Sequence, residues 1–232
     1  MVPISEKDCS IVIPAYNEEE RISFFLEDAG NFGGTLIFVC DGDDKTTDII
    51  MAFSDEHPDI DIKCLNFNRR LGKGGGVLEG ILAAGTPFVG FVDADGSTSV
   101  SEMFGLFCNL SDSDCAVGSR WLSASEIVVG QSLWRKFQSR IFNLAVRLLF
   151  GLKISDTQCG AKVFRTEAVC AVLPSLVSRG FEFDVELLWR LNKMGYHIKE
   201  VPIVWEDRAN SRVGSSDGLG MLCALIRIRF GL

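Results

Sequence analysis

Residues 88–96 read Phe-Val-Gly-Phe-Val-Asp-Ala-Asp-Gly, so two carboxylates come directly after five apolar or glycine residues. The apolar run predicts a buried strand over Phe88–Val92, and Asp93 and Asp95 follow its end. In an open α/β sheet, ligands bind beyond the carboxyl ends of the strands. Two oxygen ligands one residue apart suit Mg²⁺ or Mn²⁺, which leaves other positions to water and substrate phosphates. The alternative is a turn in which both carboxylates only cap Ser97 and the residues after it.

The first 120 residues alternate short β-branched runs with longer segments of helical period, which is typical of a mostly parallel sheet covered by helices. We expect strands at Ser10–Pro14, Thr35–Cys40, Ile60–Leu65, Phe88–Val92 and Asp114–Val117. Helices are expected near Glu18–Ala29, Thr46–Glu56, Gly74–Ala84 and Ser101–Leu110. After Arg120 the pattern predicts, in order, a long helix near Ser132–Phe150, a strand near Lys162–Arg165, a helix near Phe183–Met194 and a last strand near Lys199–Trp205.

Polar residues also follow two other expected strands. Residues 11–18 read Ile-Val-Ile-Pro-Ala-Tyr-Asn-Glu, a strand that leads into a helix. The amides of such a helix start can hold an anion, and Glu18 can accept a hydrogen bond from a sugar or base. Asp41, followed by Asp43 and Asp44, is suited to accept the imide N–H of uracil. Taken alone, each stretch could equally be an ordinary connection or a solvated turn.

Residues 69–76 read Arg-Arg-Leu-Gly-Lys-Gly-Gly-Gly, which places three cations and a flexible backbone at the start of an expected helix. Such a loop could cradle a diphosphate. It matches neither the Walker A pattern nor G-x-G-x-x-G. The alternative is a loop that needs glycine to turn tightly. All four polar stretches follow consecutive strands of one sheet, so we expect them to lie close together in space.

Six stretches together are more specific than any one of them: Val12–Glu18, Arg70–Gly75, Asp93–Gly96, Gly118–Arg120, Asp156–Lys162 and Phe183–Leu188. In this combination the chain, from about Ser10 to Trp205, resembles the family 2 glycosyltransferases of the GT-A fold. Within them it is similar to the polyprenyl-phosphate hexosyltransferases, and above all to the dolichyl-phosphate glucosyltransferases. The resemblance implies a Rossmann-like, mostly parallel α/β sheet flanked by helices, with C-terminal interfacial helices.

The resemblance also implies roles for individual residues. The nucleotide sugar would be held by Pro14, Ala15, Tyr16, Glu18, Asp41, Lys73, Asp93 and Ala94. Asp93 and Asp95 would hold the donor diphosphate through Mg²⁺ or Mn²⁺. Arg120 would contact the donor or acceptor phosphate, and Arg135 with Ser139 matches an Arg-x-x-x-Ser acceptor-phosphate site. The implied catalytic residues are Asp95, Arg120, Asp156 and Gln158, of which the last two could instead cap a loop.

Two positions depart from the family pattern. Cys40 stands where the family usually has the first acid of an Asp-Asp-Gly sequence, so Asp41 would make the base contact alone. Ser97 stands where the mannosyl branch can place a glutamine near the metal, which favours glucose over mannose as the sugar. Asp184 and Glu186 could bind a ligand or could form a helix start that supports the site.

Residues 127–155 contain no acidic side chain but five basic ones: Arg135, Lys136, Arg140, Arg147 and Lys153. Helical spacing puts four apolar side chains on one face beside these cations: Phe137, Ile141, Leu144 and Leu148. This pattern predicts a helix that lies in the plane of an anionic membrane surface. The alternative is a helix that packs this face on the core. Leu219–Leu232, with Arg227 and Arg229, reads the same way. We therefore expect a domain at 1–205, including the interfacial helix 132–150, and a loop with a short amphipathic helix at 206–232.

The net charge is −8, from 23 basic and 31 acidic side chains among 232 residues, which argues against a general nucleic-acid binder. The mean hydropathy of +0.21 excludes intrinsic disorder. Eight cysteines form no C-x-x-C pair, which favours free thiols in a reducing compartment. The first ten residues lack the apolar segment of a signal peptide, and no apolar run reaches the ~20 residues that span a bilayer. We expect a peripheral protein at the cytoplasmic face of a membrane.

The hypothesis from the sequence is inverting transfer of a hexose from a nucleoside diphosphate sugar, UDP-glucose favoured, to polyprenyl (dolichyl) phosphate. A phosphate with a second pKa of about 6 is largely dianionic at neutral pH and attacks without a dedicated base. Three alternatives stay open: a GDP-mannose-dependent enzyme, a transferase with a soluble hydroxyl acceptor that needs a base such as Asp156, and an idle nucleotide- or lipid-binding protein. The sequence does not decide the oligomeric state.

Overall fold

The main sheet has seven strands in the order β3-β2-β1-β4-β7-β5-β8. The computed structural model describes residues 3–30, 32–129, 133–206 and 217–231, of which 129, 133–139 and 217–219 are described by their backbone alone. In sheet order the strands are β3 Asp61–Asn66, β2 Thr35–Cys40, β1 Cys9–Ala15, β4 Phe88–Phe91, β7 Lys162–Arg165, β5 Cys115–Ser119 and β8 Ile198–Pro202. Neighbouring strands are parallel except at β7, which is antiparallel to both β4 and β5.

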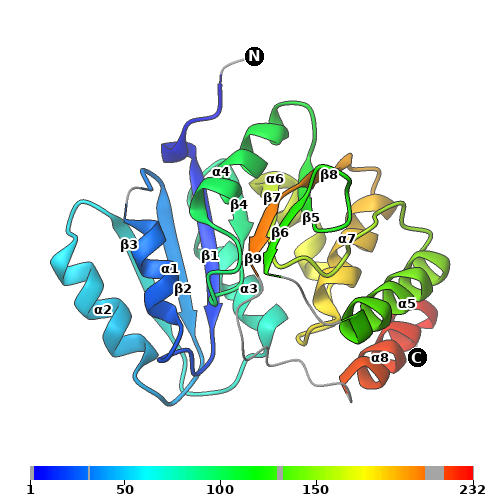
Figure 1. The fold of residues 1–232 in the computed structure, drawn as a ribbon, viewed down its shortest axis with the longest axis horizontal. Coiled ribbons are helices and arrows are strands. Elements are labelled where there is room, and N and C mark those ends of the chain that lie inside the picture. Colours follow the sequence, from blue (N-terminus) through cyan, green and yellow to red (C-terminus); the bar gives the residue numbers. More distant parts are fainter. Residues whose placement is uncertain (1–2, 31, 130–132, 207–216, 232) are drawn as a thin grey trace.

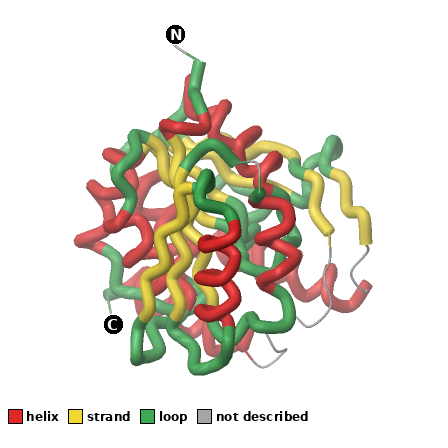
Figure 2. The backbone as a smooth tube through the Cα atoms, turned by 90° about the vertical axis from the view of Figure 1, so that its left-hand side faces the viewer, coloured by secondary structure: helices red, strands yellow, loops and turns green. Residues whose placement is uncertain are grey.

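Helices cover both faces of this sheet (Figures 1 and 2). One face packs against α1 Ile22–Ala29, α2 Thr46–Glu56 and α4 Val100–Cys108. The other packs against α3 Lys73–Ala83, α5 Leu133–Phe150, α6 Thr166–Val172, α7 Phe183–Lys193 and α8 Asp217–Phe230. The side chains of β1 alternate between the two faces, so apolar residues need a helical layer on each side. Ile11 and Ile13 belong to the first apolar layer and Val12 to the second, because successive strand residues point to opposite faces.

Most expected elements are confirmed, with β2, α2 and β7 at the predicted bounds. The helix expected from Glu18 begins only at Ile22, because the Glu18 N–H donates to Thr46 Oγ1 at 2.7 Å and its carboxylate pairs with Arg21. Two elements, α6 and a short strand β6 Glu126–Val129, were not predicted.

The single strand expected at Lys199–Trp205 is wrong in its extent. The structure divides it into β8, which ends at Pro202, and β9 Val204–Glu206. Pro202 has no N–H to donate, which ends the ladder with β5. The chain then leaves the main sheet, and β9 pairs in parallel with β6 to form a second small sheet beside it (Figure 2).

None of the helices in the described ranges is both long and apolar enough to cross a bilayer. All eight cysteines are free.

Candidate functional site

The candidate site lies at one edge of the sheet, where β1 to β4 end (Figure 1). These four strands are mutually parallel, so the polar segments that follow them meet at the same edge. The antiparallel β7 begins at this edge with Lys162, while β5 ends there and is followed by Arg120. The structure therefore brings together the four polar stretches singled out in the sequence and adds residues from β7 and from the loop before it.

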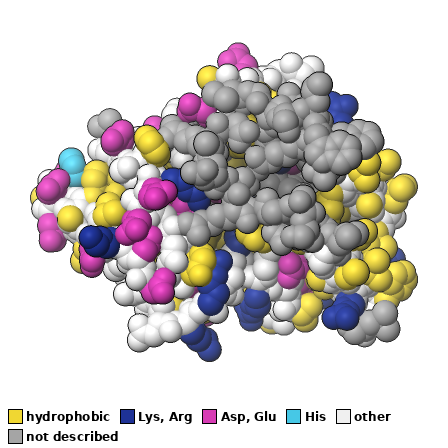
Figure 3. Space-filling model, turned by 60° about the horizontal axis from the view of Figure 1, so that its bottom comes forward, with side chains coloured by type: hydrophobic (Ala, Val, Ile, Leu, Met, Phe, Trp, Pro, Cys, Tyr) yellow, Lys and Arg dark blue, Asp and Glu magenta, His cyan; other side chains and the backbone are white. Residues whose placement is uncertain are grey.

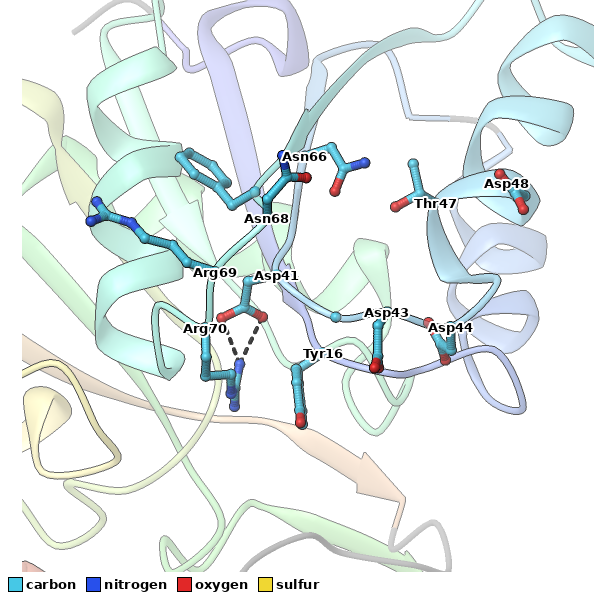
Figure 4. Close-up of a pocket in the computed structure, with 12 residues that line it drawn as sticks. Tyr16, Asp41, Asp43, Asp44, Thr47, Asp48, Asn66, Asn68, Arg69 and Arg70 are labelled. Atoms are coloured by element: carbon cyan, nitrogen blue, oxygen red, sulfur yellow. Dashed lines mark hydrogen bonds and ion pairs between the residues drawn. The ribbon is translucent and has the colours of Figure 1, made fainter.

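A cavity of about 580 Å³ opens at the ends of β2 and β3, a volume typical of small-molecule sites. It is lined by Tyr16, Asp41, Gly42, Asp43, Asp44, Thr47, Asp48, Asn66, Phe67, Asn68, Arg69 and Arg70. Figure 4 shows the side chains of Asp41 and Arg70 pointing at one another. The wall combines an aromatic ring, amide groups and charges of both signs, which can stack on and hydrogen-bond a flat polar ring.

Asp41 is the centre of this pocket. Its carboxylate accepts bonds from Arg70 Nη1 at 2.6 and 2.7 Å and from the amides of Leu71 and Gly72 at 2.7 and 3.2 Å. The Arg70 guanidinium also stacks on the Tyr16 ring, 3.5 Å from its centroid. Asp41, in the loop after β2, thus holds the loop after β3 in place. Arg70 of that loop in turn contacts Tyr16 in the loop after β1. Arg70, which the sequence assigned to a diphosphate cradle, lies in the nucleotide-sized pocket and is paired there.

Six of the eight residues predicted to hold the nucleotide sugar do not line this cavity. Lys73, Asp93 and Ala94 lie at the start of α3 and after β4 and are described below. The other three are Pro14, Ala15 and Glu18. Pro14 and Ala15 belong to β1, and a Cβ added at Gly76 of α3 would lie 3.2 Å from the Pro14 Cβ. Glu18 is 7% exposed and pairs with Arg21. In this structure all three shape the loop that carries Tyr16.

Asp93 and Asp95 follow β4 as predicted, and Ala94 between them is buried. Burial opposes ionisation of Asp93, but the positive charges of Lys73, Lys162 and Arg120 outweigh it and leave its pKa lowered. Asp95 behaves in the opposite way, because burial and the neighbouring Asp93 charge raise its pKa. Asp95 also accepts the Ser97 N–H at 3.0 Å, so part of the capping alternative is present.

A chain of four charges leads from Asp93 into the core. Lys73 Nζ lies 2.7 Å from Asp93 Oδ1 and 3.5 Å from Asp184 Oδ2. Lys162 Nζ lies 2.7 Å from Asp184 Oδ1 and donates to the Cys159 carbonyl at 2.5 Å. Lys162 and Asp184 are buried, whereas the Asp93 side chain is 44% exposed. Asp93 is therefore the end of the chain that faces the site, and Asp184 acts from α7 as a support.

Gly160 lies directly beside the Asp93 carboxylate. A Cβ at residue 160 would lie 2.0 Å from Asp93 Oδ2, closer than any side chain could remain. The backbone of the Cys159–Gly160 segment thus packs directly against the carboxylate and limits its movement. The sequence placed this glycine in a family motif but gave no physical reason for it.

Arg120 and Asp156 form a buried bidentate pair. Arg120 Nε and Nη2 lie 2.7 and 2.9 Å from the Asp156 carboxylate oxygens, and the Arg120 N–H donates at 3.1 Å. Asp156 is 0% exposed, and the Arg120 guanidinium lies over the Trp205 ring, 5.3 Å from its centroid. Burial works against the charged guanidinium, but the Asp156 charge outweighs it and raises the pKa of Arg120. Asp156 thus orients Arg120 and is not free to act as a base.

The remaining predicted residues fall in two places. Gln158 is half-buried in the loop before β7, two residues after Asp156. Arg135 and Ser139 lie in α5, and their side chains are outside the described part of the structure. Glu186 accepts bonds from Val177, Ser178 and Arg190, so it holds the loop before α7.

The residues present fit a divalent cation at Asp93 and Asp95. Both carboxylates are hard oxygen ligands on one short turn, and Asp93 has an exposed side chain. Within the described ranges no group of three or more His, Cys, Asp and Glu side chains could hold a metal. A cation here would have two protein ligands and would take the rest from a diphosphate and water, which is the usual coordination of Mg²⁺ in phosphate sites.

Three of the four residues of the predicted apolar face of α5 do not pack on the core, and the side chain of the fourth, Phe137, lies outside the described part of the structure. Ile141, Leu144 and Leu148 are 53, 56 and 78% exposed, whereas Val146 and Phe150 of the same helix are buried. α8 lies beside α5, where Arg229 Nε donates to the Leu149 carbonyl at 3.0 Å, and it adds two exposed side chains, Ile226 and Phe230. Figure 3 shows hydrophobic side chains and cations together at this end of the molecule. We call these five exposed residues the α5–α8 apolar face.

A mostly parallel α/β sheet, with a ring-sized pocket and a carboxylate pair at its strand ends, agrees with the GT-A fold expected from the sequence. Residues 10–172 match glycosyl transferase family 2, and the chain belongs to this family. The dolichyl-phosphate β-glucosyltransferase of Dictyostelium discoideum is 30% identical over 247 residues, which cover 98% of this chain and 76% of that protein.

Two solved structures confirm the expected GT-A fold. The mannosyltransferase of Pyrobaculum calidifontis in complex with GDP-Man and Mn²⁺ has a TM-score of 0.69 at 15% identity and covers 99% of this chain, which spans 65% of its length. The glucosyl-3-phosphoglycerate synthase of Mycobacterium tuberculosis, in complex with Mn²⁺, UDP and phosphoglyceric acid, has a TM-score of 0.69 at 18% identity and covers 97% of this chain and 78% of its own. The fold thus accommodates both a guanine and a uracil nucleotide.

Proposed function

We propose that this chain transfers glucose from UDP-glucose to the phosphate of a polyprenyl (dolichyl) lipid, with inversion at the anomeric carbon. The observation that carries the proposal is the position of the Asp41 pocket beside the Asp93–Asp95 carboxylate pair at one sheet edge. The choice of glucose and of the lipid acceptor is supported by the name of the 30% identical relative.

The pocket would bind the nucleoside. Tyr16 and Arg70 offer a stacked pair of planar groups beside Asp41, and Asn66 and Asn68 offer amide donors and acceptors to a base or ribose. Asp93 and Asp95 would hold Mg²⁺ or Mn²⁺, which supplies positive charge to the leaving diphosphate. Lys73 and Arg120 would add cations on the same side.

The acceptor phosphate would be the nucleophile. It is largely dianionic at neutral pH, so an oxygen can attack the anomeric carbon while the bond to the leaving diphosphate breaks. No base is needed, which agrees with a fully buried Asp156 that is held by Arg120. A soluble hydroxyl acceptor would need a base, and Asp156 is not placed to be one. The protein then contributes alignment and charge.

The α5–α8 apolar face would place the chain on a membrane, at its cytoplasmic side, as a peripheral protein. Four exposed arginines of the described side chains of α5 and α8 accompany the face: Arg140, Arg147, Arg227 and Arg229. Apolar side chains beside cations favour an anionic lipid surface. Residues 1–205 would form the catalytic domain, and residues 206–232 would add α8 as a second amphipathic segment.

Nucleotide release tests the proposed function. UDP-glucose and GDP-mannose are incubated in parallel with Mg²⁺ or Mn²⁺, with and without dolichyl phosphate in detergent. We expect UDP release from UDP-glucose that depends on the lipid. Lipid-dependent release from GDP-mannose alone would reassign the donor. Release that ignores the lipid would favour a soluble acceptor, and binding without release would favour an idle binding protein.

Vesicle binding tests the membrane contact. The double variant Leu144→Glu with Leu148→Glu should bind vesicles that contain anionic lipid about tenfold or more weakly. Each change replaces an apolar side chain that would be buried in the membrane with a negative charge that anionic lipid repels. Leu82→Glu is the matched control, because Leu82 is 67% exposed on α3 and lies outside the α5–α8 apolar face. Co-sedimentation measures all three proteins. Equal binding of the double variant and the control would exclude this face as the contact.

A further inference from the structure

Lys73 lies between two carboxylates that have different surroundings. It is the first residue of α3, and its ammonium is 2.7 Å from Asp93 Oδ1 and 3.5 Å from Asp184 Oδ2. Asp184 has a second partner in Lys162, at 2.7 Å, whereas Asp93 forms its ion pair with Lys73, also at 2.7 Å. Lys73 is therefore held most closely by the carboxylate that faces the site.

The four charges of this cluster sum to zero, since two carboxylates face two ammonium groups. Lys73 also occupies one oxygen of Asp93 that a divalent cation would need. The other oxygen of Asp93 lies beside the backbone at Gly160, where an added Cβ would be 2.0 Å away. In the absence of a donor, the Asp93 carboxylate that a divalent cation would bind is already neutralised by Lys73.

We propose that Lys73 is an exchangeable counter-ion, which holds Asp93 in the free protein and releases it when a diphosphate arrives. This inference rests on the proposed function, because it assumes that Asp93 and Asp95 hold the metal of the donor complex. Lys73 then turns from Asp93 toward the diphosphate oxygens while Asp184 retains it on the other side. Binding of the diphosphate and binding of the cation become coupled. The diphosphate draws the positive charge of Lys73 away from Asp93, and the cation neutralises the Asp93 carboxylate that would repel the diphosphate.

The geometry allows this exchange at low cost. A lysine ammonium is a compact charge on a flexible stem, so it can change partners with small rotations. Asp184 is already within 3.5 Å, and it is fixed by Lys162. The backbone that carries the flexible Lys73 side chain is fixed, however. Gly72, directly before it, has a φ of 76°, and a Cβ there would lie 2.5 Å from the Arg179 carbonyl oxygen.

Mn²⁺ affinity measured without any donor tests the proposal directly. Lys73→Met removes the competing ammonium, and Asp184 keeps Lys162 as its partner, so the buried part of the cluster stays paired. Electron paramagnetic resonance of free Mn²⁺ gives the Kd with and without UDP. We expect Lys73→Met to bind Mn²⁺ about tenfold or more tightly than wild type in the absence of UDP. The gain in Mn²⁺ affinity that UDP confers should be large in wild type and much smaller in the variant.

Arg21→Met is the matched control for charge. Arg21 forms an ion pair with Glu18, and its charge also acts on Asp95. If a nearby positive charge alone opposed the cation, this variant would tighten Mn²⁺ binding as much as Lys73→Met. We expect a change of less than about threefold, because the Glu18 carboxylate already balances the Arg21 charge.

The outcomes separate this inference from the proposed function. Equal Mn²⁺ affinity of Lys73→Met and wild type without UDP, or equal tightening by Arg21→Met, would overturn the role of Lys73. Tight Mn²⁺ binding by Lys73→Met with no effect of UDP on any protein would keep the counter-ion and contradict the proposed donor. Should Lys73→Met fail to fold, Lys73→Gln tests the same point with a neutral side chain that still hydrogen-bonds.

Discussion

Asp95→Ala lowers the rate of sugar transfer by at least about a thousandfold at saturating Mg²⁺ or Mn²⁺. The expectation follows from the position of Asp95, one of two carboxylates at the end of β4 that can hold a cation against the diphosphate. Losing one of two protein ligands removes most of the charge stabilisation of the leaving group, which is worth several kcal/mol. The measurement is the initial rate of nucleotide release with donor and lipid acceptor at saturation.

Loss of folding would not explain such a result. The change removes the hydrogen bonds that Asp95 accepts from the Ser97 N–H, at 3.0 Å, and from the Ser97 side chain, and such a cap is worth about 1 kcal/mol. Asp112→Ala is the control, because it removes a carboxylate from an exposed ion pair with Lys199. Its rate should equal that of wild type. An Asp95→Ala protein that keeps its activity in metal-replete buffer would contradict the metal assignment.

Arg120→Met should reduce the free energy of unfolding by about 3–5 kcal/mol, because it leaves the carboxylate of Asp156 without a counter-charge. Asp156 is 0% exposed, and two of its three bonds from residue 120 come from the guanidinium. Only the backbone N–H of residue 120 would remain. Urea unfolding followed by circular dichroism measures the effect.

Arg190→Met provides a comparison with the same change of side chain. Its partner Glu186 is also 0% exposed, but Glu186 keeps bonds from the amides of Val177 and Ser178 and from the Ser178 hydroxyl. We therefore expect a loss of only about 1–2 kcal/mol. Equal losses in the two variants would mean that the Arg120–Asp156 pair contributes no more than an ordinary ion pair.

The sequence predicts the parallel half of the sheet well, because β1, β2 and β4 are mostly apolar runs between turn residues. β2 Thr35–Cys40, followed by Asp41-Gly42, is at its predicted bounds, as is α2. The elements that differ depend on contacts between distant segments. β6 pairs with β9, about 75 residues later, and each of these strands is only three or four residues long, too short for a clear alternating pattern.

The candidate site divides in the same way. Asp41, Asp93 and Asp95 could be found from the sequence because they directly follow predicted strands. The partners of these residues could not. Local patterns predict the strand of Lys162 and the helix of Asp184, but not that the strand pairs in antiparallel fashion with β4 and brings the two residues together at the site. The sequence also assigned Lys73 to a phosphate, whereas the structure pairs it with Asp93.

The α5–α8 apolar face shows a further limit of sequence patterns. The spacing of Ile141, Leu144 and Leu148 predicts one apolar face but does not say whether the core covers it. The structure answers this for the described residues, because Val146 and Phe150 make the core contact and the predicted face is exposed. An exposed face of this kind marks an interaction site, and the cations beside it favour a lipid surface.

The most direct test of the central claim follows the sugar itself. UDP-glucose labelled in the glucose is incubated with the protein, Mg²⁺ and dolichyl phosphate in detergent, and the label is counted in the organic phase after extraction. We predict that label enters the organic phase only when the lipid phosphate is present, and that mild acid releases it as free glucose. Label that stays in the aqueous phase, while UDP is released at the same rate with and without lipid, would contradict a lipid-phosphate acceptor.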